Sequence, residues 1–109
     1  MKLVIAIVQD ADVTFLMDSL TEENYRVTKL ATTGGFLREG NTTLLIGIEE
    51  EKLDDVIKII EDNCKTRTTS TTVLNPSAES PLLGTSIPID INLGGATVFV
   101  LDIAQYIRI

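Results

Sequence analysis

The residues best suited to binding lie around a glycine-rich segment between two strand-like stretches. Residues 28–48 read TKLATTGGFLREGNTTLLIGI, so Phe36, Leu37, Arg38 and Asn41 follow a pair of glycines. Loop tips held by rigid strands commonly carry binding groups. This tip offers bare backbone N–H groups, one aromatic ring, one cation and one side-chain amide. That set suits an anionic small molecule with rings, such as a nucleotide, and does not suit bond-breaking chemistry.

The residues that most enzymes use for catalysis are scarce in this chain. It contains no histidine, the commonest general base and the commonest metal ligand. Its single cysteine, Cys64, ends an apolar helical stripe, where a buried structural thiol is expected rather than a nucleophile. Clustered carboxylates and a Walker-type Gly-Lys-Ser/Thr sequence are also absent. We therefore predict no catalytic activity, no metal and no cofactor, and keep a small enzyme acting on phosphate esters as a disfavoured alternative.

Composition and charge exclude several kinds of partner. The 109 residues are enough for one domain, and 44% hydrophobic with 23% charged residues is typical of a globular protein. The net charge of −7 argues against nucleic acid or an anionic membrane surface as a partner. The apolar start of the chain meets Gln9 and Asp10 too early for membrane insertion. A single cysteine fits a reducing cytoplasm, which is the predicted location.

Two amphipathic helices are predicted from apolar residues at helical spacing. The first has the stripe Val13, Leu16, Met17 and Leu20, with Asp10 or Asp12 as its N-cap and Asn24 as its stop. The second begins in the acidic residues 49–51, which favour a helix N-terminus. Its stripe consists of Leu53, Val56, Ile57 and Ile60.

Five segments have the character of strands. Residues 3–8 and 96–101 are apolar on both faces, whereas residues 25–33, 42–48 and 87–93 carry β-branched or alternating patterns. The Thr- and Ser-rich residues 65–86 lack such a pattern and are predicted to form a long loop. A turn is predicted at Gly94 and Gly95.

The order of these elements predicts an α+β fold, a ferredoxin-like βαββαβ sandwich with an extra strand after a long loop. Both helices should cover one face of an antiparallel sheet. The first and last strands are nevertheless apolar on both sides, so the second face needs a cover as well. Because the chain has no elements left to provide it, we predict self-association through this face.

Two motifs resemble those of a known family. Residues 30–38 (LATTGGFLR) and 94–101 (GGATVFVL) are similar to segments of the PII-like cyclic di-AMP receptor proteins of Gram-positive bacteria, the PstA/DarA family. The resemblance runs from residues 4–10 nearly to Leu101. It implies a single PII-like domain over residues 1–109 and a cytosolic homotrimer that binds cyclic di-AMP at each subunit interface. It also implies that the protein receives a signal and passes it to an unidentified downstream protein.

The resemblance also implies which residues contact the ligand. They come from the first helix end and second strand, the tip, the third strand and a neighbouring subunit's last strand: Asn24, Arg26, Thr28, Gly35, Phe36, Leu37, Asn41, Gly47 and Phe99. Their chemistry agrees, because glycines let backbone N–H groups approach a phosphate and aromatic rings stack on purines. Each also has a purely structural interpretation, such as turn formation at the glycines or subunit packing at Phe99.

Two positions depart from the family's pattern. Asp102 stands where members have proline, and Arg108 lies near the position at which members often carry a glutamine. The predicted function is a cyclic di-AMP receptor whose loops reorder on binding. The alternative within the same class is a PII-type sensor of ATP, ADP and 2-oxoglutarate, which the short first loop disfavours.

Overall fold

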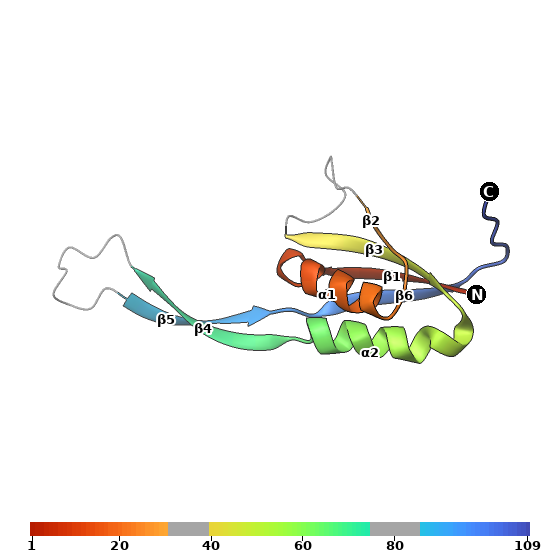
Figure 1. The fold of residues 1–109 in the computed structure, drawn as a ribbon. Coiled ribbons are helices and arrows are strands. Elements are labelled where there is room, and N and C mark those ends of the chain that lie inside the picture. The colour runs from red at the N-terminus through yellow and green to blue at the C-terminus, as the bar shows by residue number, and fades with distance from the viewer. Residues whose placement is uncertain (31–39, 75–85) are drawn as a thin grey trace.

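A four-stranded antiparallel sheet with two helices on one face forms the body of the protein (Figure 1). The computed structural model describes residues 1–30, 40–74 and 86–109, and within 69–74 and 86–91 it describes the backbone alone. The body contains β1 (Lys2–Gln9), α1 (Asp10–Glu22), β2 (Val27–Lys29), β3 (Asn41–Ile48), α2 (Leu53–Cys64) and β6 (Ala96–Asp102). The strands lie in the order β2-β3-β1-β6, which is that of a ferredoxin-like sandwich. The predicted fold class is therefore confirmed.

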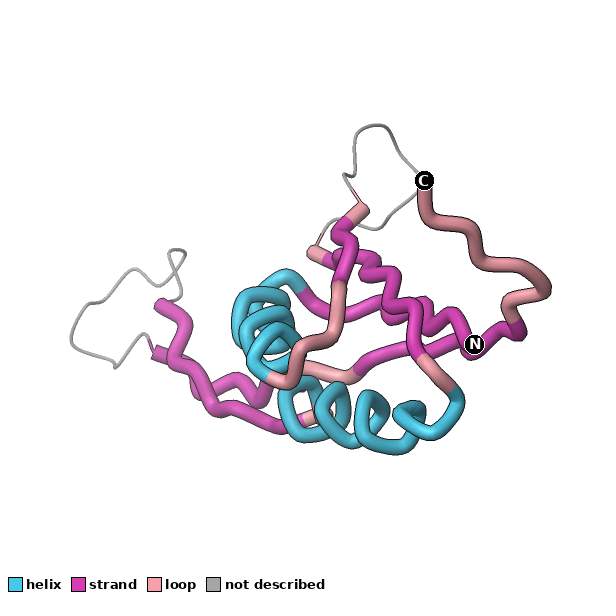
Figure 2. The backbone as a smooth tube through the Cα atoms, turned by 45° about the vertical axis from the view of Figure 1, so that its right-hand side comes forward, coloured by secondary structure: helices cyan, strands magenta, loops and turns pink. Residues whose placement is uncertain are grey.

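The hydrophobic core lies between this sheet and the two helices. Val13, Leu16 and Leu20 of α1 are buried, and Met17 packs against them. Val56 and Ile60 of α2 are buried as well, whereas Leu53 and Ile57 are half-buried. The apolar stripes read from the sequence are thus the helix faces that meet the sheet. Figure 2 shows both helices on the same side, with residues 103–109 extending away from them.

The central strand β1 has two different faces. Val4, Ala6 and Val8 are buried under the helices, while Leu3, Ile5 and Ile7 alternate with them and remain half-buried. Side chains directly opposite one another in a sheet share a face. Ile5 pairs with Leu45 and Phe99. The second, helix-free face is consequently apolar, as the sequence predicted, and no described element covers it.

The segment predicted as a long loop contains a strand, so that prediction was wrong. Residues Arg67–Leu74 form β4, which pairs with β5 (Ser86–Leu93) in a separate two-stranded sheet. This ribbon, here called the arm, projects from the body (Figure 1). The β-branched threonines of β4 suit an extended backbone, and a paired strand needs no apolar periodicity of its own. The predicted extra strand, β5, is therefore one half of a hairpin outside the main sheet.

Local predictions near the ends of α1 and β2 also need correction. Gln9 occupies the N-cap position of α1 without a side-chain capping bond, so neither Asp10 nor Asp12 is the cap. Thr42 donates to the carboxylate of Asp10, and Asp12 pairs with Arg67. These long-range partners engage both carboxylates inside the helix. Strand β2 spans only Val27–Lys29, and residues 31–33 of the predicted strand lie outside the described residues.

The second helix begins close to its predicted start. A short 3-10 turn, η1 (Glu50–Lys52), leads into α2 within the acidic run. In the described part of the chain, no helix combines the length and apolar character needed to cross a membrane.

The bend between β5 and β6 yields a test of the fold. Gly94 has φ +84°, and a Cβ there would lie 2.6 Å from the Lys65 carbonyl oxygen. We expect Gly94→Ala to lower the free energy of unfolding by about 1–3 kcal/mol, because both the backbone and the contact become strained. Thermal and urea unfolding measure the change. Gly47→Ala is the matched control, since a Cβ there meets nothing within 4 Å. Equal stability of the two variants would contradict the assigned bend.

Candidate functional site

The strand register brings several predicted site residues onto the helix-free face. Thr28 lies opposite Leu45, and Leu45 lies opposite Ile5, which pairs in turn with Phe99. Thr28 and Phe99 therefore lie at the two ends of one row across the sheet. Arg26 precedes β2 by one residue and, by alternation, belongs to the same face as Thr28. Asn41 and Gly47 share it as well, because each stands an even number of positions from Leu45 along β3.

Asn24 is held in place by the end of the first helix. Its backbone N–H donates to the Thr21 carbonyl over 2.9 Å, and the N–H of Tyr25 donates to the Leu20 carbonyl over 2.9 Å. This pair of bonds is the Schellman motif, whose C′ residue adopts a left-handed backbone. Asn24 has φ +65°, a conformation that asparagine tolerates better than most residues. The predicted stop of the helix is confirmed, and Asn24 has a structural role that does not require its amide.

Tyr25 fixes the chain between Asn24 and Arg26. Its ring packs against the core, and its hydroxyl donates to Asp55 Oδ2 on α2 over 2.6 Å. This hydrogen bond to the carboxylate is the main cause that raises the pKa of Tyr25 to about 12. The phenol thus remains a proton donor at neutral pH. The corner carrying the two predicted ligand residues is tied to both helices.

A surface pocket of about 280 Å³ lies beside this corner. We call it the Arg26 pocket, and its lining includes Asn24, Tyr25, Arg26, Gly47, Glu49 and Lys52. Three predicted site residues are thereby brought together from two segments of the chain. Lys52 was missed by the sequence reasoning, because an isolated lysine after three glutamates is typical of a solvated helix start.

A second pocket, of about 340 Å³, lies at the opposite end of β3. This Asn41 pocket is lined by Ile7, Gln9, Asn41, Gly94, Gly95, Ala96 and Thr97. Asn41 and Gly47 are six positions apart on β3, which corresponds to roughly 20 Å of extended strand. Within one chain, the predicted residues thus divide between two ends of the sheet.

Of the other predicted site residues, two are exposed on the sheet and three lie outside the described part of the chain. Phe99 on edge strand β6 is 52% exposed, so its ring is accessible from the helix-free face. Gly35, Phe36 and Leu37 lie outside the described residues. Thr28 is exposed but lines neither of the two pockets.

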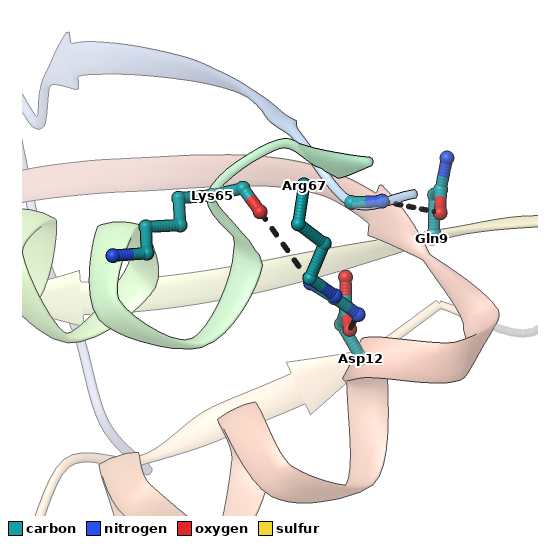
Figure 3. Close-up of polar contacts among 5 residues, drawn as sticks. Gln9, Asp12, Lys65 and Arg67 are labelled. Carbon is teal, nitrogen blue, oxygen red and sulfur yellow. Dashed lines mark hydrogen bonds and ion pairs between the residues drawn. The ribbon is translucent and has the colours of Figure 1, made fainter. Parts of the chain in front are cut away.

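The base of the arm is joined to the body by a polar cluster (Figure 3). Arg67 Nη2 at the start of β4 lies 2.6 Å from Oδ1 of Asp12, whose residue is only 3% exposed. Gly94 N–H donates to Gln9 Oε1 over 2.7 Å, and Gly95 N–H donates to the Cys64 carbonyl. Gln9 and Gly94 also line the Asn41 pocket, so this pocket lies at the base of the arm.

Cys64 is a structural residue, as predicted. Its side chain belongs to the core with 1% exposure. Burial is the first cause that raises the pKa of the thiol to about 11, and nearby Asp12 adds to the effect. Little thiolate is present at neutral pH, which is unfavourable for a nucleophile. Within the described residues, no group of three or more His, Cys, Asp or Glu side chains is arranged to hold a metal ion.

Comparison with known proteins is consistent with these features. The family described as "Cyclic-di-AMP receptor" matches residues 1–109, the whole chain. Among solved structures, a protein of unknown function from Pediococcus pentosaceus ATCC 25745 is similar, with 46% sequence identity and a TM-score of 0.75. The match covers 99% of this chain and 96% of that one.

The polar cluster at the arm base leads to a prediction about the arm. We expect Arg67→Met to increase hydrogen exchange of the backbone amides in β4 and β5, because it removes the ion pair with Asp12 while keeping a long side chain. The loss of stability should be about 1–3 kcal/mol, since a buried carboxylate is left without its donor. Lys65→Ala is the control, as Lys65 contacts Arg67 only through its backbone carbonyl. Unchanged exchange in Arg67→Met would show that the ion pair does not hold the arm.

Proposed function

The chain belongs to the cyclic di-AMP receptor family, and we propose that it binds cyclic di-AMP on the helix-free face of its sheet, between subunits of a homotrimer. The observation that carries this proposal is the register. It aligns Thr28, Gly47, Asn41 and Phe99 on one face, although they come from three strands. Arg26 adjoins β2 and joins this face by alternation. The proposed role is signal reception rather than catalysis.

The chemistry of the face matches that of a cyclic dinucleotide. Arg26 supplies a guanidinium that can hold a phosphate through two parallel hydrogen bonds. Asn24 and Asn41 supply amides that donate and accept at once, as recognition of an adenine edge requires. The exposed ring of Phe99 offers a stacking surface for a purine, worth on the order of 1–3 kcal/mol per base.

The division of these residues between two pockets favours a site shared by subunits. A ligand held at both ends within one chain would have to follow β3 over roughly 20 Å. In the proposed trimer, one subunit's Arg26 pocket lies near another subunit's Phe99, so that each chain contributes half of a site. The apolar helix-free face, with Leu101 46% exposed, supplies the contact area between subunits.

Binding is proposed to act on a cytoplasmic downstream protein through the segments next to the site. Residues 34–41 carry the predicted tip contacts, and Gly94 and Gly95, which directly follow the arm, line the Asn41 pocket. Ligand binding beside Asn41 therefore reorders the tip and the arm in this proposal. A PII-type sensor of ATP, ADP and 2-oxoglutarate is the second candidate, and the family match favours cyclic di-AMP over it.

Calorimetric titration with cyclic di-AMP tests the proposed ligand. We expect one ligand per subunit and clear preference over cyclic di-GMP and ATP. Asn24→Gly should raise the Kd roughly tenfold without lowering stability, because glycine keeps the left-handed cap while the amide is lost. Asn41→Ala should also weaken binding.

The controls separate recognition from folding. The control variant Asn63→Ala removes a side-chain amide from α2. Asn63 accepts a hydrogen bond from Ser19 and lines neither pocket, so the Kd for cyclic di-AMP should be unchanged. Binding of ATP but not cyclic di-AMP would assign the chain to the PII-type class. Full affinity in both Asn24→Gly and Asn41→Ala would remove the proposed site.

The proposed trimer is tested by a charge placed on the helix-free face. Leu101→Lys should convert the trimer to monomers in sedimentation velocity, since a lysine cannot be buried in an apolar contact without a large cost. Phe15→Lys is the matched control. Phe15 is 71% exposed on α1, and changing it should leave the trimer intact. A wild-type monomer, or a trimer that survives Leu101→Lys, would refute this arrangement.

A further inference from the structure

The Arg26 pocket contains a cation that the family motifs do not include. Lys52, at the end of η1, lines it together with Arg26 and with the open backbone of Gly47. The lysine and the arginine are 26 residues apart in the sequence. The connection from β3 into η1 brings Lys52 to the same pocket as Arg26.

Neither cation is neutralised by an ion pair among the described residues. The two ion pairs found there are Lys2 with Asp102 and Arg67 with Asp12. The chain has 16 acidic residues against 9 basic ones, and two of those basic residues meet at this one pocket. Glu49 is the one carboxylate in the lining, which leaves an excess of positive charge. Such a pocket favours an anionic group, one that forms only part of cyclic di-AMP.

The backbones that carry the two cations are anchored. Lys52 N–H donates to the Glu49 carbonyl over 3.0 Å, and α2 continues directly from Lys52. Arg26 follows Tyr25, whose hydroxyl is bonded to Asp55 on that same helix. A site built on anchored segments loses little conformational entropy when it binds. Gly47 adds space, because nothing lies within 4 Å of where its Cβ would be.

We propose that Lys52 contacts the ligand directly and that, together with Arg26, it holds a phosphodiester group in the Arg26 pocket. This inference rests on the proposed function and adds to it a residue and the part of the ligand that it binds. The guanidinium supplies the planar, two-pronged contact, and the lysine ammonium supplies a mobile point charge. A phosphate at Arg26 and Lys52 leaves the amide and aromatic groups elsewhere on the face for the bases.

The test compares two lysine variants of the full-length protein with cyclic di-AMP as the probe. Lys52→Gln should raise the Kd roughly tenfold at low salt and reduce the dependence of the Kd on salt concentration. Lys58→Gln should match the wild type. Lys58 is an exposed lysine on α2 outside the pocket, so both variants change the net charge equally. Lys52→Arg, which retains the charge, should recover most of the affinity.

A second probe separates this inference from the proposed function. Titration of ¹⁵N-labelled protein with pyrophosphate should shift the backbone amide signals of Arg26 and Gly47 in the wild type and in Lys58→Gln, but much less in Lys52→Gln. A wild type that binds pyrophosphate here but not cyclic di-AMP would refute the proposed ligand and support the anion site. Equal cyclic di-AMP affinity and salt dependence in Lys52→Gln and wild type would overturn the role of Lys52. Equal pyrophosphate shifts in the two proteins would overturn it as well.

Discussion

The alternation of apolar side chains along β1 is the constraint on which the rest of the structure depends. Strand β1 is central, and its Val4, Ala6 and Val8 pack beneath the two helices. Because side chains alternate along a strand, Leu3, Ile5 and Ile7 necessarily point to the other face of the sheet. A shift of one residue in its pairing would exchange the two sets. The same register that builds the core therefore builds the helix-free face. In this way the folding of one chain prepares the surface that the proposed trimer and ligand use.

Several residues of the proposed site are placed by requirements of folding. Asn24 closes α1 in a left-handed conformation, and Tyr25 ties the next residue to α2. Gly47 leaves the surface of β3 open. Backbone that is fixed by a helix end or by hydrogen bonds to a helix holds binding groups with little loss of entropy. A structural role and a binding role are thus compatible at these residues.

The arm depends on a few contacts at its base rather than on a core of its own. An isolated two-stranded ribbon is marginally stable in water. Here Arg67 reaches the buried Asp12 of α1, while Gly94 donates to Gln9 at the end of β1. These two body residues adjoin the junction of β1 and α1, and Gln9 faces the Asn41 pocket. The arm is therefore attached close to one half of the proposed site, which is the arrangement expected of a segment that responds to a ligand.

Local patterns sufficed for the helices, the main strands and the fold class, since 3.6- and 2-residue periodicities directly reflect which faces are buried. The resemblance to the family implied that Asn24, Arg26 and Gly47 belong to one site. The patterns failed for β4, whose threonines pair with β5 without an apolar face of their own. They also failed for Asp10 and Asp12, which look like caps but bond to residues more than 30 positions away.

The sequence by itself determined which side chains must be buried, because hydrophobic periodicity is encoded locally. It also determined, through the excess of apolar strand faces, that one surface needs a cover. Only the tertiary structure decided that Lys52 joins Arg26, that Asn41 lies far from both, and that the arm is attached at Asp12. These placements depend on strand order, register and chain crossings, which arise from contacts between distant residues.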